Sequence, residues 1–265
     1  MTKSNREYFW FLLLTLLLSV PFYIWGAFFP VEGLPFGLPI SFLMIFIPFF
    51  LSLIYAYKEN GTNGVAFLFK RIFDLNRANR WSIIFCLACM PLIAALTYLT
   101  MKLFSFPLPL ETVIPYKEIP LMVLLYFLGA IPEEFGWTST LTEPLAKAYG
   151  PIKAGIMIGS VWGVWHIIPW SWAHPAEWII GMCLLNALMR IAMIYAYMYG
   201  GKSLFAALVF HTMINVATGI FPNYGSHLNT WVFNAWMAVM LLSVMYFIRR
   251  KSEARNVIHA LRVYI

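Results

Sequence analysis

The chain has 265 residues, of which 62% are hydrophobic and 11% are charged, with a mean hydropathy of +0.76 and a formal net charge of +7. Soluble domains carry charge on about a quarter of their residues, so this composition excludes a soluble protein and indicates an integral membrane protein. The polar segments are too short for a sizeable soluble domain, and we expect a single integral membrane domain over residues 1–265. The distribution of basic residues favours orientation in a bilayer over a nucleic-acid surface, so no nucleic acid is expected as a partner.

Apolar segments long enough to cross a bilayer, which takes about 20 residues each, follow one another along the whole chain. They predict an all-α fold, a polytopic membrane helix bundle with about eight transmembrane helices, at residues 8–29, 38–57, 81–102, 119–141, 152–172, 177–199, 203–220 and 229–248. The first resembles a signal peptide, but no small-residue cleavage site follows it, so we expect an uncleaved span. The segment 58–80 is the longest polar loop, and its basic, amphipathic middle is expected on the membrane surface.

Basic side chains set the predicted orientation, because cytoplasmic loops of membrane proteins are enriched in Lys and Arg. With the N-terminus inside, only Lys102 and Lys117 fall in outer loops, while Arg190 lies within a span. An odd number of spans would scramble this partition, so we expect both termini in the cytoplasm, and a bacterial plasma membrane as the location. Interfacial aromatic residues and solvated histidines are expected near the outer ends of the spans, at Trp170, Trp172, Trp178, Trp231, His174 and His227.

The three cysteines are Cys86, Cys89 and Cys183. Cys86 and Cys89 form a C-x-x-C, a spacing seen in redox and zinc motifs. They lie in an apolar run with no second ligand pair. We interpret them as small side chains that face lipid or other helices.

Ionisable and amide side chains stand inside three of the predicted spans, where a charge costs a few kcal/mol or more. They are Glu133 and Glu134 in the fourth span, His166 in the fifth, and His211 and Asn215 in the seventh. At about 1.5 Å per residue, the glutamates and His211 lie roughly 12 Å from the inner edge and His166 roughly 20 Å. Because the hydrocarbon core is about 30 Å thick, we expect these groups to meet in one cavity within the membrane.

Spacing groups these side chains further. His211 and Asn215 are four residues apart and share a helix face, as do Trp162 and His166. The adjacent glutamates point about 100° apart around the helix axis, so we expect them to have different roles. Pro132 removes one helical hydrogen bond and predicts a kink just before the glutamates, which is tolerated where backbone lines a cavity.

Glutamate, two imidazoles and an amide are sufficient for amide hydrolysis without a covalent intermediate. A glutamate can take a proton from water and return it to a leaving amine. One imidazole can hold the water, and a second imidazole with an amide N–H can bind the developing oxyanion. Two glutamates and two histidines are also adequate ligands for zinc or iron, so a metal site stays open at this point, although the spacing is not H-E-x-x-H.

Three segments resemble the motifs of the type II CAAX prenyl protease and bacteriocin-processing (CPBP) family: PEEFGW at 132–137, WGVWH at 162–166 and GGKSLFAALVFHTMIN at 200–215. Each motif alone is weak, but three in order, each on a predicted span, are fairly specific. The family consists of intramembrane glutamic endopeptidases with an eight-helix fold, and the resemblance covers about 125–220 as the catalytic core. It implies metal-free hydrolysis without a cofactor, acting on a peptide or protein substrate such as a prenylated CAAX tail or a bacteriocin precursor.

Carried over position by position, the resemblance implies that Glu133 activates water and that His166 positions it. His211 and Asn215 would form the oxyanion hole. Glu134 corresponds to the second glutamate of the family's pair.

One position departs from the family pattern. The first motif usually has an arginine four residues after the second glutamate, but Thr138 stands there, so an i,i+4 salt bridge to Glu134 is absent. Arg190, in the sixth span, lies near the predicted depth of Glu133, and we hypothesise that it supplies the cation from another helix. The alternative is that Arg190 snorkels to the inner interface.

Three functions therefore stay open. The leading one is an intramembrane endopeptidase that cleaves near the cytoplasmic side. The second is a catalytically weak or inactive homologue that serves as a membrane scaffold or a bacteriocin immunity protein. Thr138 in place of the family's arginine is the feature that supports this alternative. The third is a proton-coupled transporter, because intramembrane Glu and His serve there too, although no inverted repeat is visible.

Overall fold

The computed structural model describes residues 3–28 and 40–263, and in these ranges all regular structure is helical, as predicted. The longer helices follow one another in the order of the predicted spans. They are α1 (Lys3–Phe28), α2 (Phe46–Lys70), α3 (Arg80–Leu103), α4 (Ile119–Glu134), α6 (Pro151–Ser171), α7 (Ala176–Tyr199), α8 (Leu204–Gly219) and α9 (Thr230–Val263). The short α5 (Glu143–Tyr149) continues the chain after α4, and a 3₁₀ turn, η2 (Ile40–Ile45), leads into α2.

Among the described residues, 7 helical segments are long and apolar enough to span a membrane, and α8 is apolar but shorter. A chain with this many apolar helices is a multi-pass integral membrane protein. The predicted spans at 8–29 and 38–57 each run into residues outside the described ranges. The cytoplasmic location of the termini stays a prediction.

The polar loop predicted at 58–80 is wrong for most of its length. Helix α2 continues to Lys70, interrupted only by non-helical backbone at Asn60 and Gly61, where Gly61 has a φ of 57°. Two 3₁₀ turns follow, η3 (Arg71–Phe73) and η4 (Leu75–Arg77). Glycine readily adopts the positive φ needed at the break, and the apolar residues after it form helix again.

The fourth span has a different irregularity from the one that Pro132 predicted. Helix α4 includes Pro132 and runs on to Glu134, and a π-helix, η6 (Phe135–Thr142), then joins α4 to α5. Hydroxyl groups satisfy two carbonyls of this wider turn, since Thr140 donates to Phe135 O and Thr142 donates to Trp137 O. Stretches of π-helix are rare and often stand at functional sites.

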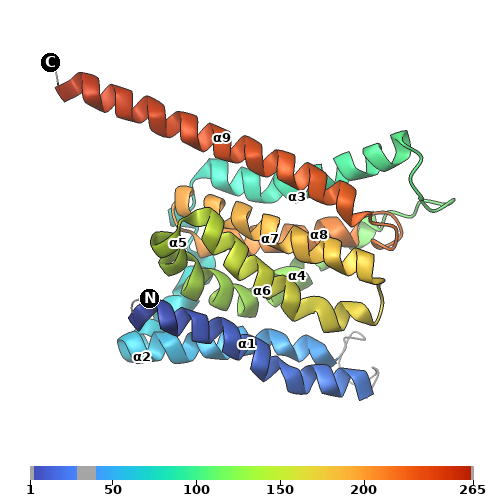
Figure 1. Ribbon diagram of the computed structural model, residues 1–265, viewed down its shortest axis with the longest axis horizontal. Helices are drawn as coiled ribbons and strands as arrows, with labels where there is room; N and C mark the ends of the chain where they lie inside the picture. The colour runs from blue at the N-terminus through green and yellow to red at the C-terminus, as the bar shows by residue number, and fades with distance from the viewer. Residues whose placement is uncertain (1–2, 29–39, 264–265) are drawn as a thin grey trace.

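The helices form a bundle with α4, α6, α7 and α8 in its middle (Figure 1). Helices α1 and α2 lie together along one side, and α3 and α9 lie along the opposite side (Figure 1). The polar spans predicted from the sequence are therefore the central ones. Central placement removes their polar side chains from lipid, as intramembrane charges require.

Helices α6 and α7 pack most closely, and glycines explain why. A Cβ on Gly159 would stand 2.6 Å from Ala187 Cα, and one on Gly155 would stand 2.7 Å from Ile191 Cα. A Cβ on Gly163 would stand 3.0 Å from Cys183 Cα. The spacing G-x₃-G-x₃-G lets two membrane helices approach backbone to backbone.

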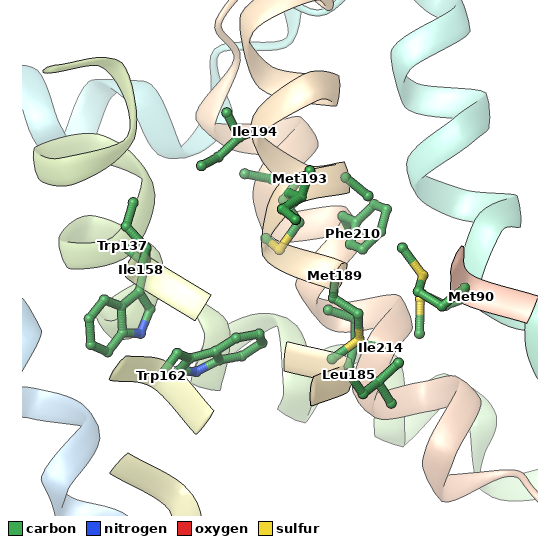
Figure 2. Close-up of a cluster of buried hydrophobic side chains, with 14 of the residues drawn as sticks. Met90, Trp137, Ile158, Trp162, Leu185, Met189, Met193, Ile194, Phe210 and Ile214 are labelled. Atoms are coloured by element: carbon green, nitrogen blue, oxygen red, sulfur yellow. The ribbon is translucent and has the colours of Figure 1, made fainter. Parts of the chain in front are cut away.

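A core of Trp, Met, Ile, Leu and Phe side chains fills the space around these helices (Figure 2). Trp137 and Trp165 are fully buried and meet edge to face at 5.7 Å. Cys86 and Cys89 are buried in the same core, which agrees with their interpretation as small packing residues. This packing holds the central helices in fixed relative positions.

Candidate active site

Glu133, at the end of α4, is held by two tryptophans. Its Oε2 accepts from Trp162 Nε1 at 2.9 Å and from Trp137 Nε1 at 3.3 Å. The residue is 7% exposed. Both indoles bind the same oxygen, so among the described residues Oε1 receives no hydrogen bond.

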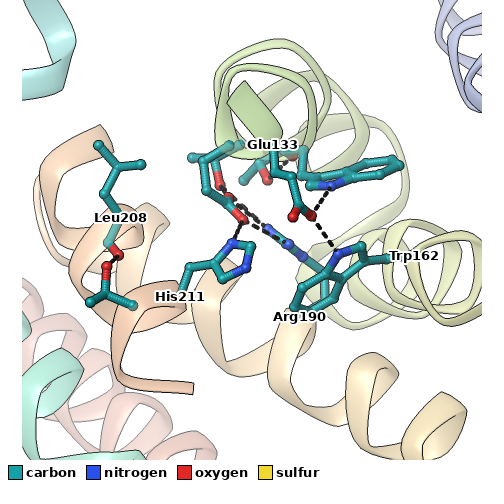
Figure 3. A network of polar contacts seen from close by, with 10 residues as sticks. Glu133, Trp162, Arg190, Leu208 and His211 are labelled. Atoms are coloured by element: carbon teal, nitrogen blue, oxygen red, sulfur yellow. Dashed lines mark hydrogen bonds and ion pairs between the residues drawn. The ribbon is translucent and has the colours of Figure 1, made fainter. Parts of the chain in front are cut away.

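Glu134, the next residue, faces a separate set of partners on three elements. Arg190 of α7 forms a two-pronged ion pair with it, with Nη1 at 2.9 Å from Oε2 and Nη2 at 3.0 Å from Oε1. His211 of α8 places Nδ1 2.8 Å from Oε1, and the Thr138 hydroxyl donates to Oε2. In Figure 3 the Arg190 and His211 side chains converge from their two helices, and dashed lines mark their contacts. The adjacent glutamates thus have different surroundings, as their angular separation predicted.

The Arg190 guanidinium is completely buried, so it does not snorkel to an interface. Its Nη1 also lies 3.5 Å from the Thr138 hydroxyl, and its Cζ lies 4.6 Å from the centre of the Trp162 ring. The contact hypothesised between Arg190 and Glu134 is present. Thr138, which stands where the family has an arginine, joins the same contact from the glutamate's own chain segment.

The hydrogen bonds of the two histidines specify which ring nitrogen carries a proton. His166 Nδ1 lies 2.8 Å from the carbonyl oxygen of Trp162, which can only accept, so Nδ1 is the donor. Neutral His166 therefore presents Nε2 as an acceptor. His211 Nδ1 faces a carboxylate that is already paired with arginine, so it donates too. Its Nε2 becomes a donor when the ring carries both protons.

Aromatic rings bring the histidines to the same site. The Trp162 ring lies between them, 5.9 Å from the His166 ring and 5.2 Å from the His211 ring. His166 also stacks on Trp170 at 4.9 Å. The predicted meeting of the fourth, fifth and seventh spans is thus present, with the sixth span added through Arg190.

Asn215 is the predicted site residue with the fewest contacts. It lies one turn after His211 on α8 and is half-buried, and its side chain makes no hydrogen bond within the described part of the chain. An amide without a hydrogen-bond partner is free to bind a group that reaches it.

Trp137 belongs to the site and was missed in the sequence. Its position four residues after Glu133, one helical turn away, is the signal that identifies it. Gly136 was missed as well: a Cβ there would stand 2.6 Å from Pro48 Cβ, so glycine lets α2 pack against the π-helix that follows the glutamates.

His174, expected to be solvated, and Trp178, expected at the interface, pack against each other more tightly than predicted. His174 is half-buried and stacks on Trp178 at 3.7 Å, while His227 is exposed. Burial lowers the pKa of the His174 imidazole. Loss of contact with water disfavours the charged form of the ring.

In the described residues, no group of three or more His, Cys, Asp or Glu side chains is placed to hold a metal ion. Arg190 and Thr138 already occupy the carboxylate of Glu134.

Comparison with known proteins agrees with the motif resemblance. Residues 115–217 match the family model described as type II CAAX prenyl endopeptidase Rce1-like. "CAAX prenyl protease 2" of Methanococcus maripaludis is 24% identical over 186 residues, which cover 64% of this chain and 67% of that relative. Residues 115–217 include every site residue described above.

Proposed function

Because residues 115–217 match the Rce1-like type II CAAX prenyl endopeptidase family model, we propose that the protein is an intramembrane endopeptidase in which Glu133 activates water. The observation that carries the proposal is the division of labour between the glutamates. Glu134 is saturated by an ion pair and hydrogen bonds, whereas Glu133 keeps one carboxylate oxygen available. A general base needs such an accessible lone pair.

In this proposal, Oε1 of Glu133 takes a proton from water while the water oxygen attacks the carbonyl carbon of the substrate. His166 holds the water by accepting its second O–H at Nε2, the nitrogen left without a proton. The Trp162 and Trp137 indoles fix the carboxylate in the orientation that this step needs. Orientation of this kind removes a large entropic part of the barrier.

The tetrahedral intermediate carries an oxyanion. His211 donates to it from Nε2 when the ring carries both protons, and the Asn215 amide donates beside it. Removing one such donor costs about 10²–10³ in kcat in well-studied enzymes. Glu133 then returns its proton to the leaving nitrogen, the C–N bond breaks, and the products are a carboxylic acid and an amine.

The substrate follows from the family and from the location of the site. A peptide with a prenylated CAAX-type C-terminus is the first class to test, and a bacteriocin-type precursor is the second. A lipid group would place the scissile bond of such a peptide at the membrane, where the site lies between apolar helices.

The test is cleavage of a lipidated-peptide library by the purified protein, wild type against Glu133→Ala and His166→Ala, with and without a metal chelator. Cleavage that both variants lose and that the chelator leaves unchanged supports the proposal. Wild-type protein that cleaves no member of either substrate class would refute it in favour of a non-catalytic homologue, and proton flux in liposomes would favour a transporter.

A further inference from the structure

Arg190 contacts the surroundings of both glutamates at once. It pairs directly with Glu134 through two N–H groups. Its guanidinium also stacks against Trp162, whose indole N–H binds Glu133. Figure 3 shows Arg190 beside Trp162, with Glu133 on the other side of the Trp162 indole N–H.

We propose that Arg190 is a positioning residue that couples the two glutamates: it fixes Glu134, and with it His211, by ion pairing, and it fixes Glu133 through Trp162. This inference rests on the proposed function. It goes further because it assigns to one cation on α7 both the support of the oxyanion-binding histidine and the orientation of the base.

The geometry of guanidinium explains why one residue can do both. Its planar fork meets a carboxylate through two parallel N–H groups, and its flat face stacks on an aromatic ring. The two contacts use different parts of the group, the edge and the face. Lysine carries the same charge but offers neither the fork nor the flat face.

The Arg190 side chain has little room to change its conformation. The side chain is fully buried, and Gly159 of α6 lies against its base, where a Cβ would stand 3.0 Å from Arg190 Cβ. Trp162 is on the same helix as Gly159, about one turn further along. The close α6–α7 contact therefore sets the distance between the guanidinium and the indole.

The Thr138 hydroxyl completes the arrangement. An arginine at 138 would reach Glu134 from its own chain segment and would not stack on Trp162 from α7. With threonine there, the hydroxyl takes part in binding Oε2, and the cation is supplied by α7, where it also meets Trp162. The base and its supporting residues thus respond together to any movement of α7.

The matched control is Arg71, a second buried arginine that also contacts aromatic rings. It donates to the Tyr197 hydroxyl at 2.6 Å and lies 5.7 Å from the Phe67 and Tyr197 ring centres. None of its contacts involves the glutamates. Arg71→Lys makes the same chemical change as Arg190→Lys at a place outside the site.

The experiment compares these two variants in detergent by NMR of ¹⁵N-labelled tryptophan side chains and by cleavage kinetics. The Trp162 indole resonance is assigned by its loss in Trp162→Phe. We expect Arg190→Lys to shift this resonance and to lower kcat by about 10²-fold with little change in KM, as for a catalytic group misplaced by about 1 Å. Arg71→Lys should leave both readouts at their wild-type values.

Unchanged Trp162 resonance and unchanged kcat in folded Arg190→Lys would overturn the inference. If that variant does not fold, Thr138→Arg with Arg190→Met supplies a guanidinium to Glu134 without the stack on Trp162. It should cleave more slowly than wild type, and wild-type cleavage by it would overturn the coupling. If wild-type protein cleaves nothing, the proposed function fails, while the Trp162 resonance still decides the coupling.

Discussion

A methyl group added at Gly159 would test whether the α6–α7 contact sets the geometry of the site. In Gly159→Ala the new Cβ would stand 2.6 Å from Ala187 Cα and 2.8 Å from Asn186 O, both backbone atoms that cannot rotate away. Carbon atoms in favourable contact are about 3.5–4.0 Å apart, so the two helices must separate by about 1 Å. Trp162 moves with α6 and Arg190 moves with α7.

The magnitude follows from this displacement. Overpacking of a tight interface costs about 1–3 kcal/mol of stability, and misplacement of catalytic groups by about 1 Å can cost about 10²-fold in rate. We therefore expect Gly159→Ala to unfold at a lower temperature and to show a kcat about 100 times below wild type. The assays are thermal unfolding in detergent and cleavage of the substrate found by library screening.

The matched control is Gly129→Ala, on α4. A Cβ there meets only Phe42 Cζ at 3.9 Å, an ordinary contact, and alanine is the better helix former by about 0.5–1 kcal/mol. This variant should be as active as wild type and equally or more stable. If Gly159→Ala matches Gly129→Ala in both assays, the α6–α7 contact does not control the site.

Three further outcomes are expected. Asn215→Ala should lower kcat by about 10²–10³-fold without changing thermal unfolding, because its side chain makes no hydrogen bond in the described part of the chain; unchanged kcat would remove it from the oxyanion hole. Tyr197→Phe removes the nearer of the two acceptors of Arg71 Nη2, the other being Lys202 O, and should cost about 1 kcal/mol of stability with kcat preserved, and a selective loss of kcat would contradict this division. His174 should titrate below the ordinary value of about 6.5 in an NMR pH series, because burial disfavours its charged form, and a midpoint at or above that value would contradict this.

Much of the fold could be predicted because hydropathy follows directly from composition. Where the structure describes them, the predicted apolar segments are helical except at the end positions 172, 203, 220 and 229. The error at 58–80 has a physical cause: charged side chains at the water interface do not stop a helix, and α2 continues past Asn60 and Gly61. Hydropathy reports where a chain leaves the membrane and not where its helix ends.

For the candidate site, the position of each side chain along the membrane normal could be predicted. Counting residues gives the depth of a side chain in the membrane, and depth alone suggested that Arg190 could reach the glutamates. It does not say which helix lies beside which. That Arg190 meets both Glu134 and Trp162 depends on lateral packing of α6 against α7.

Part of that lateral packing was nevertheless readable. Gly155, Gly159 and Gly163 repeat at intervals of four, the spacing by which membrane helices approach closely. The π-helix after Glu134 has no comparable signal in the spacing of its residues. Hydrogen-bond partners of the two histidines also follow from three-dimensional placement and not from spacing.

The central claim is that Glu133 is the base that activates water, and replacing it by its isosteric amide tests this most directly. Glu133→Gln keeps an oxygen that can accept from the Trp162 and Trp137 indoles but cannot take the proton from water. The measurement is single-turnover cleavage by this variant alongside wild type. We predict a loss of about 10²–10⁴-fold, the usual contribution of a general base, with an unchanged unfolding temperature. Cleavage at the wild-type rate by folded Glu133→Gln would contradict the claim.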